Sequence, residues 1–63
     1  MTGEELKALR KRLGLSLKTV TRQVEVSNST WCRWESGKNK IPDGAVKLFL
    51  LLNADAIRDN PAP

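Results

Sequence analysis

The sequence predicts an all-α fold, a compact bundle of four to five short helices in one domain over residues 1–60, followed by a disordered tail at residues 61–63. Two observations predict it. Apolar residues recur three and four positions apart in several short runs, which is the spacing of one helix face. Each run is also bounded by residues that start or stop helices, so that only short turns separate the runs.

The first two helices have well-marked ends. Thr2 and Glu5 form a capping-box pattern in front of a leucine stripe, which predicts a helix over about residues 3–13. Gly14 suits the left-handed position that follows a helix. Ser16 then suits the N-cap of a second helix over about residues 17–24, whose apolar positions again have helical spacing.

Only a short turn separates the second helix from the third, so the two helices must meet at a steep angle. This predicts a helix-turn-helix arrangement. Ser27 suits its N-cap and Gly37 its C-terminal stop, with residues 28–36 between them. Helical spacing places two tryptophans and a glutamate on one face, namely Trp31, Trp34 and Glu35. The opposite face and the exposed first turn carry Asn28, Ser29, Cys32, Arg33 and Ser36. A face with Asn, Ser and Arg side chains suits the edges of DNA bases.

A fourth helix is expected from the Pro42–Asp43 start signal to about Leu52. Its five successive apolar residues at 48–52 cannot all face one core, because successive residues point about 100° apart around a helix. Part of this surface is therefore expected to meet another chain. A last turn or two should contain Ala56 and Ile57 and stop at residues 60–61, where a proline follows Asn60.

Composition excludes several classes of function. The chain has 63 residues, one cysteine and no histidine. An intramolecular disulfide, a structural zinc site and a histidine-based catalytic group are therefore excluded, and we expect neither an enzyme nor a cofactor, metal or small-molecule ligand. The longest apolar run is too short to cross a bilayer and no basic signal peptide begins the chain, so we expect a cytoplasmic protein without membrane contact.

Positive charge is concentrated in the middle of the chain. Residues 6–41 hold nine lysines and arginines against two glutamates, a net charge of +7 within a chain whose total is +4. Such a concentration suits a phosphate-binding surface. An ordinary solvated basic surface would have the same charge.

The pattern resembles the phage repressor and Cro type (XRE family) of helix-turn-helix DNA-binding domain over about residues 4–53. The matching features are Leu6, Leu9, Arg10, the run Leu13-Gly14-Leu15-Ser16, Val20, Val24, Val26, Ser27, residues 28–35, the ending Trp34-Glu35-Ser36-Gly37-Lys38, and Pro42. The resemblance implies a lambda-repressor-like fold with a third helix, the recognition helix, that enters the major groove. It also implies that the protein binds two-fold operators as a homodimer, with its two recognition helices about 34 Å apart.

Four positions depart from the family pattern. Leu17 replaces a frequent Gln that touches phosphate, and Thr21 replaces a small residue where the second and third helices meet. Glu25 stands in place of the glycine of the turn, where a left-handed conformation would cost about 1 kcal/mol. Trp31 is larger than the usual residue at its position. We interpret these departures as altered packing within the same fold.

The candidate base-reading residues are Asn28, Ser29, Cys32 and Arg33. Arg33 can donate two hydrogen bonds to guanine, and Asn28 can pair with adenine N6 and N7, each worth about 1–3 kcal/mol of discrimination. Ser29 is equally suited to a first helical turn, and Arg33 to a phosphate or to solvent. Cys32 suits a small filler near a thymine methyl group better than a redox switch.

The candidate phosphate-binding residues lie at helix starts and in the loop after the third helix, where backbone amides and cations can meet phosphates. They are Ser16, Lys18, Ser27, Ser36, Lys38, Asn39 and Lys40. The serines could equally serve as helix caps alone. Arg10 and Glu35 are structural by the resemblance, which implies a partly buried ion pair between them. Trp31 and Trp34 suit core anchors better than base-stacking platforms.

We therefore expect a repressor that binds specific sequences of double-stranded DNA as a homodimer. We expect no ligand to switch it. Its own concentration would control it, and its own promoter is a candidate target. The expected dimer interface comprises Leu51, Leu52, Ala56 and Ile57. The alternative is a protein-interaction module, antitoxin-like or an adaptor, that binds a different protein through the apolar surface of the fourth helix.

Overall fold

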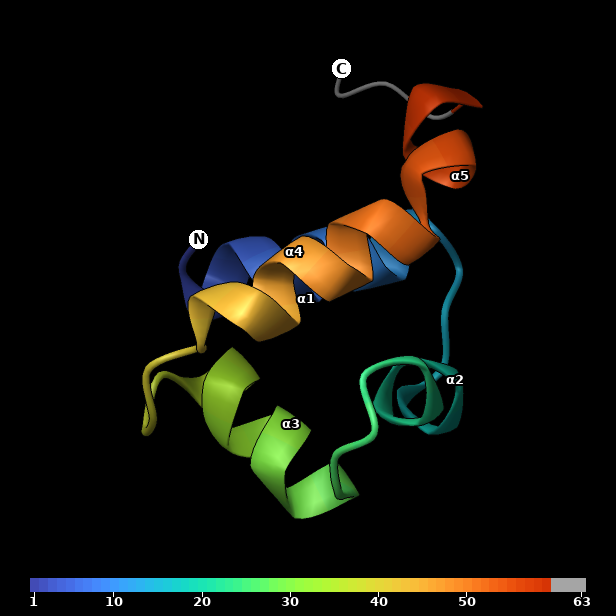
Figure 1. The fold of residues 1–63 in the computed structure, drawn as a ribbon. Helices are drawn as coiled ribbons and strands as arrows, with labels where there is room; N and C mark the ends of the chain where they lie inside the picture. The colour runs from blue at the N-terminus through green and yellow to red at the C-terminus, as the bar shows by residue number, and fades with distance from the viewer. Residues whose placement is uncertain (60–63) are drawn as a thin grey trace.

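A computed structural model describes residues 1–59. Within this range the chain forms five helices and no strand, which confirms the all-α prediction (Figure 1). The helices are α1 (Gly3–Arg12), α2 (Leu17–Gln23), α3 (Asn28–Ser36), α4 (Asp43–Leu52) and α5 (Ala54–Asp59). The stop expected at residues 60–61 and the tail expected at residues 61–63 lie outside the described residues.

The helix starts follow from their capping side chains. Thr2 Oγ1 accepts a hydrogen bond from the Glu5 amide at 3.1 Å, and Glu5 Oε1 accepts one from the Thr2 amide at 2.8 Å. This reciprocal capping box starts α1. Ser16 and Ser27 cap α2 and α3 by accepting from the amide three residues on, each at 3.2 Å. The predicted starts of the first three helices are confirmed.

The helix ends depend on left-handed residues. After α1, Gly14 has a φ of 70°, and the Leu15 amide donates to the Arg10 carbonyl at 3.0 Å. The same geometry follows α2, where Glu25 has a φ of 56° and the Val26 amide donates to the Thr21 carbonyl at 3.0 Å. This hydrogen-bond pattern satisfies carbonyls that the helix leaves free. Because Glu25 has a Cβ atom, its left-handed conformation costs about 1 kcal/mol.

The core lies where α1, α2 and α4 pack against α3. Its buried residues are Leu6, Val20, Val24, Trp31, Trp34, Ile41 and Phe49. The first turn of α1 packs tightly against the last turn of α3. A Cβ atom at Gly3 would lie 2.2 Å from the Trp34 carbonyl oxygen, so only glycine fits at this position.

A pair of amide side chains joins α2 to the junction between α4 and α5. Asn53, which is 6% exposed, donates to Gln23 Oε1 at 2.9 Å and to the Phe49 carbonyl at 2.9 Å. Gln23 Nε2 donates back to Asn53 Oδ1 at 3.4 Å. These bonds satisfy the polar atoms of a buried amide, so they fix where α5 leaves α4 relative to α2.

Candidate nucleic-acid interface

Helix α3 has one buried face and one exposed face, as its sequence predicts. Trp31 and Trp34 are 1% and 5% exposed, and Glu35 is half-buried beside them. The candidate base-reading residues Asn28, Ser29, Cys32 and Arg33 are all exposed. The structure thus places these four side chains on the accessible surface of a helix that is anchored from behind.

Aromatic packing provides much of that anchor. The ring of Trp31 lies 5.6 Å from that of Trp34 and 5.4 Å from that of Phe49, measured between centroids, with tilted and edge-on geometries. Such arrangements are favourable for aromatic pairs. The three rings join the inner face of α3 to α4, so the bulk of Trp31 is accommodated inside the core.

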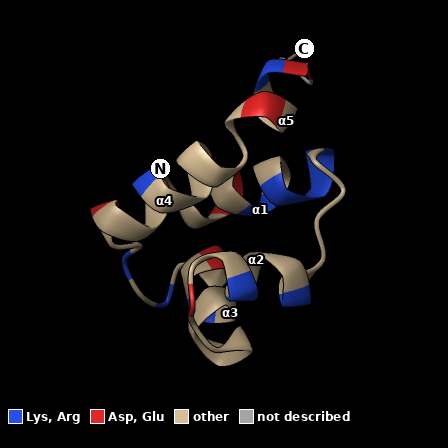
Figure 2. Cartoon of the chain, turned by 45° about the vertical axis from the view of Figure 1, so that its right-hand side comes forward, with Lys and Arg blue, Asp and Glu red and all other residues tan. Residues whose placement is uncertain are grey.

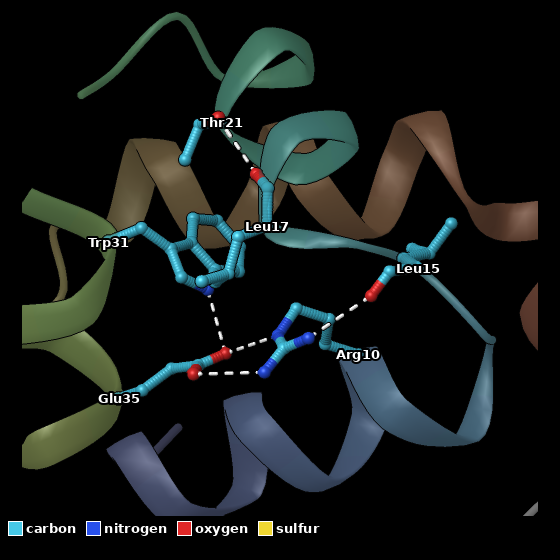
Figure 3. Close-up of polar contacts among 6 residues, drawn as sticks. All are labelled: Arg10, Leu15, Leu17, Thr21, Trp31 and Glu35. Carbon is cyan, nitrogen blue, oxygen red and sulfur yellow. Dashed lines mark hydrogen bonds and ion pairs between the residues drawn. The ribbon is translucent and has the colours of Figure 1, made fainter. Parts of the chain in front are cut away.

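The ion pair implied by the resemblance is present behind α3 (Figure 3). Arg10 Nε and Nη2 donate to the two carboxylate oxygens of Glu35 at 2.6 and 3.2 Å, and the Trp31 indole N–H donates to the same carboxylate at 2.7 Å. Arg10 Nη1 also donates to the Leu15 carbonyl at 3.1 Å. The side chains of Arg10 and Glu35 are 13% and 9% exposed. One carboxylate therefore joins α1 to α3, behind the exposed face that carries the candidate base-reading residues.

The electrostatics of Glu35 follow from these contacts. Burial raises the pKa of its carboxyl, but the hydrogen bonds from Arg10 and Trp31 and the charge of Arg10 outweigh burial and hold the pKa below its ordinary value. Glu35 is therefore ionised at neutral pH, and its charge is compensated inside the fold. It adds little negative potential to the outer face of α3.

The starts of α2 and α3 differ electrostatically from those of the other helices. Neither has an acidic residue in its first turn, whereas α1, α4 and α5 begin with Glu4 and Glu5, Asp43 and Asp55 respectively. The positive ends of the helix dipoles in α2 and α3 are thus not offset by a carboxylate within the first turn of either helix. Ser16 and Ser27 use their hydroxyls as caps, which leaves phosphate contact at these positions to the backbone amides.

The remaining candidate phosphate contacts are exposed and cationic or polar. Lys18 lies on α2, Ser36 ends α3, and Lys38, Asn39 and Lys40 lie in the loop before α4. Figure 2 shows basic residues in blue on α2 and in this loop. The loop is tied to the helix because the Asn39 amide donates to the Arg33 carbonyl at 3.3 Å. The same carbonyl accepts from Ser36 Oγ, within α3, at 3.2 Å. Among residues 1–59 only Arg10 and Arg58 form ion pairs, so these lysines have no carboxylate partner.

Sequence reasoning missed a contact between α2 and α3. The Thr21 hydroxyl lies 3.1 Å from Asn28 Oδ1, in addition to 2.8 Å from the Leu17 carbonyl oxygen. Threonine inside a helix often bonds to the carbonyl four residues earlier, and this was the available signal. The contact with Asn28 depends on the packing of the two helices. One candidate base-reading residue therefore lies within hydrogen-bond distance of a buried hydroxyl on α2.

The residues of the expected dimer interface are only partly accessible. Leu51 and Leu52 are 74% and 51% exposed, whereas Ala56 and Ile57 are half-buried. Leu48, at 38% exposed, adds to this surface. In both ribbon views α5 lies at the opposite end of the molecule from α2 and α3 (Figures 1 and 2). The part of this surface that belongs to α5, with Ala56 and Ile57, therefore lies away from α3.

No metal or membrane site emerges from the described residues. Among residues 1–59 no three His, Cys, Asp or Glu side chains lie together in a way that could hold a metal ion. Over the same range no helix has the length and apolar character needed to span a bilayer.

Comparison with known families supplies the deciding observation. The family described as "Helix-turn-helix domain" matches residues 2–52, which include α1 to α4. The chain belongs to this helix-turn-helix family. A curated relative of the helix-turn-helix chain is the type II methyltransferase M.MspI of Moraxella sp, 44% identical over 41 residues. That match covers 65% of this chain and 10% of the methyltransferase, so the chain spans about a tenth of this relative's length. No solved structure matches the chain significantly.

Proposed function

We propose that this helix-turn-helix domain is a sequence-specific regulator of transcription, a repressor of the phage repressor and Cro type, that binds an inverted-repeat operator as a homodimer. In this proposal α3 lies in the major groove of double-stranded DNA. Arg33 and Asn28 read base edges, with Ser29 and Cys32 beside them, while the residues at helix starts and in the loop contact phosphates.

The exposed polar face of α3 carries this proposal. Buried tryptophans and an ion pair hold the other face of the helix, so the backbone that carries the exposed side chains is fixed in position. Lysines that have no carboxylate partner among residues 1–59 lie on the adjacent α2 and in the loop that follows α3. A polar helix face flanked by exposed cations matches what the major groove and its phosphates require.

The curated relative adds limited support. Its name assigns methyl transfer to that protein. Because the similar segment is 10% of the methyltransferase, we propose that DNA binding, rather than methyl transfer, is the property that the two chains share. We accordingly propose a binding module and not an enzyme.

The first test is DNA binding itself. Gel-shift titration should find a site, selected from random sequences, that the domain binds far more tightly than unselected DNA. In this site Arg33→Ala should lower the preference at one base pair of each half-site by about 1–3 kcal/mol. Lys38→Ala should instead weaken binding to all sequences alike and reduce the slope of affinity against salt by about 1 for each protomer.

The two substitutions serve as controls for each other, because both remove one exposed cation near α3. If both weakened binding uniformly, Arg33 would be a phosphate contact and not a base reader. Failure of the unaltered domain to discriminate any sequence at low salt would overturn the proposed function.

The homodimer is tested separately. Leu51 is 74% exposed, so Leu51→Glu should leave the fold intact while placing a charge in the proposed interface. Sedimentation should change from dimer to monomer. Ala8→Glu, on the exposed surface of α1, introduces the same residue and should leave the dimer unchanged.

The rival function is a protein-interaction module. The exposed Leu48, Leu51 and Leu52 favour it, because a surface of this kind would suit a different protein as well as a second copy. A chain that sediments as a monomer at every concentration would contradict the homodimer and favour this rival.

A further inference from the structure

The contact between Thr21 and Asn28 joins the interior of the helix pair to its proposed reading surface. Thr21 is 7% exposed and faces α3 from within α2, whereas Asn28 is an exposed residue in the first turn of α3. The 3.1 Å separation of the Thr21 hydroxyl from Asn28 Oδ1 is within hydrogen-bond range. A buried hydroxyl thus touches the amide of a residue that we propose reads a base.

The bonding capacity of the hydroxyl limits what Asn28 can do. A threonine hydroxyl has one proton, and three acceptors surround it, namely the Leu17 carbonyl at 2.8 Å, the Lys18 carbonyl at 3.2 Å and Asn28 Oδ1. Both carbonyls belong to α2 and cannot move away. The side chain of Asn28, by contrast, can move. Contact with the hydroxyl therefore constrains the position of the Asn28 amide.

We propose that Thr21 is a positioning residue that sets the base preference of Asn28. Its hydroxyl holds one end of the Asn28 amide against α2, which selects one side-chain rotamer and leaves the other end of the amide to face the groove. An asparagine that pairs with adenine needs both ends of its amide at the base edge. An amide held at one end reads the base pair through a single, fixed contact. This inference rests on the proposed function of the domain.

Removal of the hydroxyl should therefore change recognition at one position only. Thr21→Val keeps the branched shape of the side chain, frees the amide of Asn28 and allows several rotamers. The preference at the base pair read by Asn28 should weaken about 2- to 12-fold, the range expected for one net hydrogen bond. The base pair read by Arg33 should keep its preference.

The experiment compares binding to single-base variants of the selected site. The proteins are the unaltered domain, Thr21→Val, Thr21→Ser, Asn28→Ala and the double variant Thr21→Val/Asn28→Ala. Thr21→Ser keeps a hydroxyl and should restore the preference. The double variant should lose no more preference than Asn28→Ala alone, because Thr21 acts through Asn28.

A measurement on the free, unaltered domain covers the case in which Thr21→Val does not fold. NMR coupling constants of the Asn28 Hβ protons should report one χ1 rotamer, and rotamer averaging would overturn the inference. It would also be overturned if Thr21→Val kept the preference, or weakened binding equally at every base pair. If the unaltered domain showed no sequence preference but a single Asn28 rotamer, the fault would lie in the proposed function.

Discussion

Replacement of Glu35 by alanine is expected to lower the free energy of unfolding by about 3–5 kcal/mol. The substitution leaves the Arg10 guanidinium with a single protein partner, the Leu15 carbonyl, and removes the acceptor of the Trp31 indole. An uncompensated charge in a side chain that is 13% exposed accounts for most of the loss. Denaturant unfolding followed by circular dichroism measures it. A domain of this size has only about 3–5 kcal/mol from its core, so the variant should be largely unfolded.

Two variants separate the charge from the shape. Glu35→Gln keeps the side-chain volume and one acceptor but removes the charge, so it should destabilise the domain less than alanine. The double variant Arg10→Met/Glu35→Leu replaces the pair by apolar groups and should recover much of the lost stability. If Glu35→Ala unfolded like the unaltered domain, the ion pair would contribute nothing to the fold.

The pH dependence of stability has a sign set by the lowered pKa of Glu35. Its ordinary value is 4.5, and the pKa in the folded chain lies below it because the contacts with Arg10 and Trp31 outweigh burial. The stabilisation is therefore fully present above pH 4.5 and is lost as the pH falls through the folded value. Glu35→Gln should flatten this decline. The part due to Glu5, whose pKa is lowered by its bonds with Thr2, should remain.

Replacement of Trp31 by alanine is expected to cost about 3–5 kcal/mol. Trp31 is 1% exposed, contacts the rings of Trp34 and Phe49, and donates to Glu35. The substitution would open a cavity between α3 and the core. Because the face of α3 that we propose reads bases stands on this side chain, DNA binding should be lost together with the cooperative unfolding transition.

The matched control for Trp31 is phenylalanine. Trp31→Phe keeps an aromatic ring against Phe49 but removes the indole N–H, which leaves Glu35 with Arg10 alone. It should fold, with a loss well below that of alanine. Equal losses in the two variants would mean that the hydrogen bond to Glu35, and not the ring packing, anchors α3.

Local signals in the sequence were enough to place the helices. Each cap bonds to an amide three residues away, as Thr2 does with Glu5, so both partners can be read from one short stretch. The prediction for the end of the first helix was one residue too long, because Leu13 acts as its cap. The division of α3 into two faces follows from helical spacing alone.

The candidate site was predictable in its composition and not in its bonding. The exposed positions of Asn28 and Arg33 follow from their places on α3. The sequence favoured an Asn28 amide free to pair with adenine, whereas the structure places one end of it against Thr21. Helical spacing gives the direction of a side chain but not the neighbour that another helix brings to it.

What the sequence by itself determined is the all-α class, the helix starts and the two faces of α3, since these depend on residues within four positions of one another. The tertiary structure decided the contacts between distant segments: the bonds of Gln23 to Asn53, the approach of Gly3 to Trp34 and the exposure of Leu51. These depend on the angle and separation of packed helices. The angles and separations result from how all the side chains of the core fit together, which cannot be read from any single segment of the sequence.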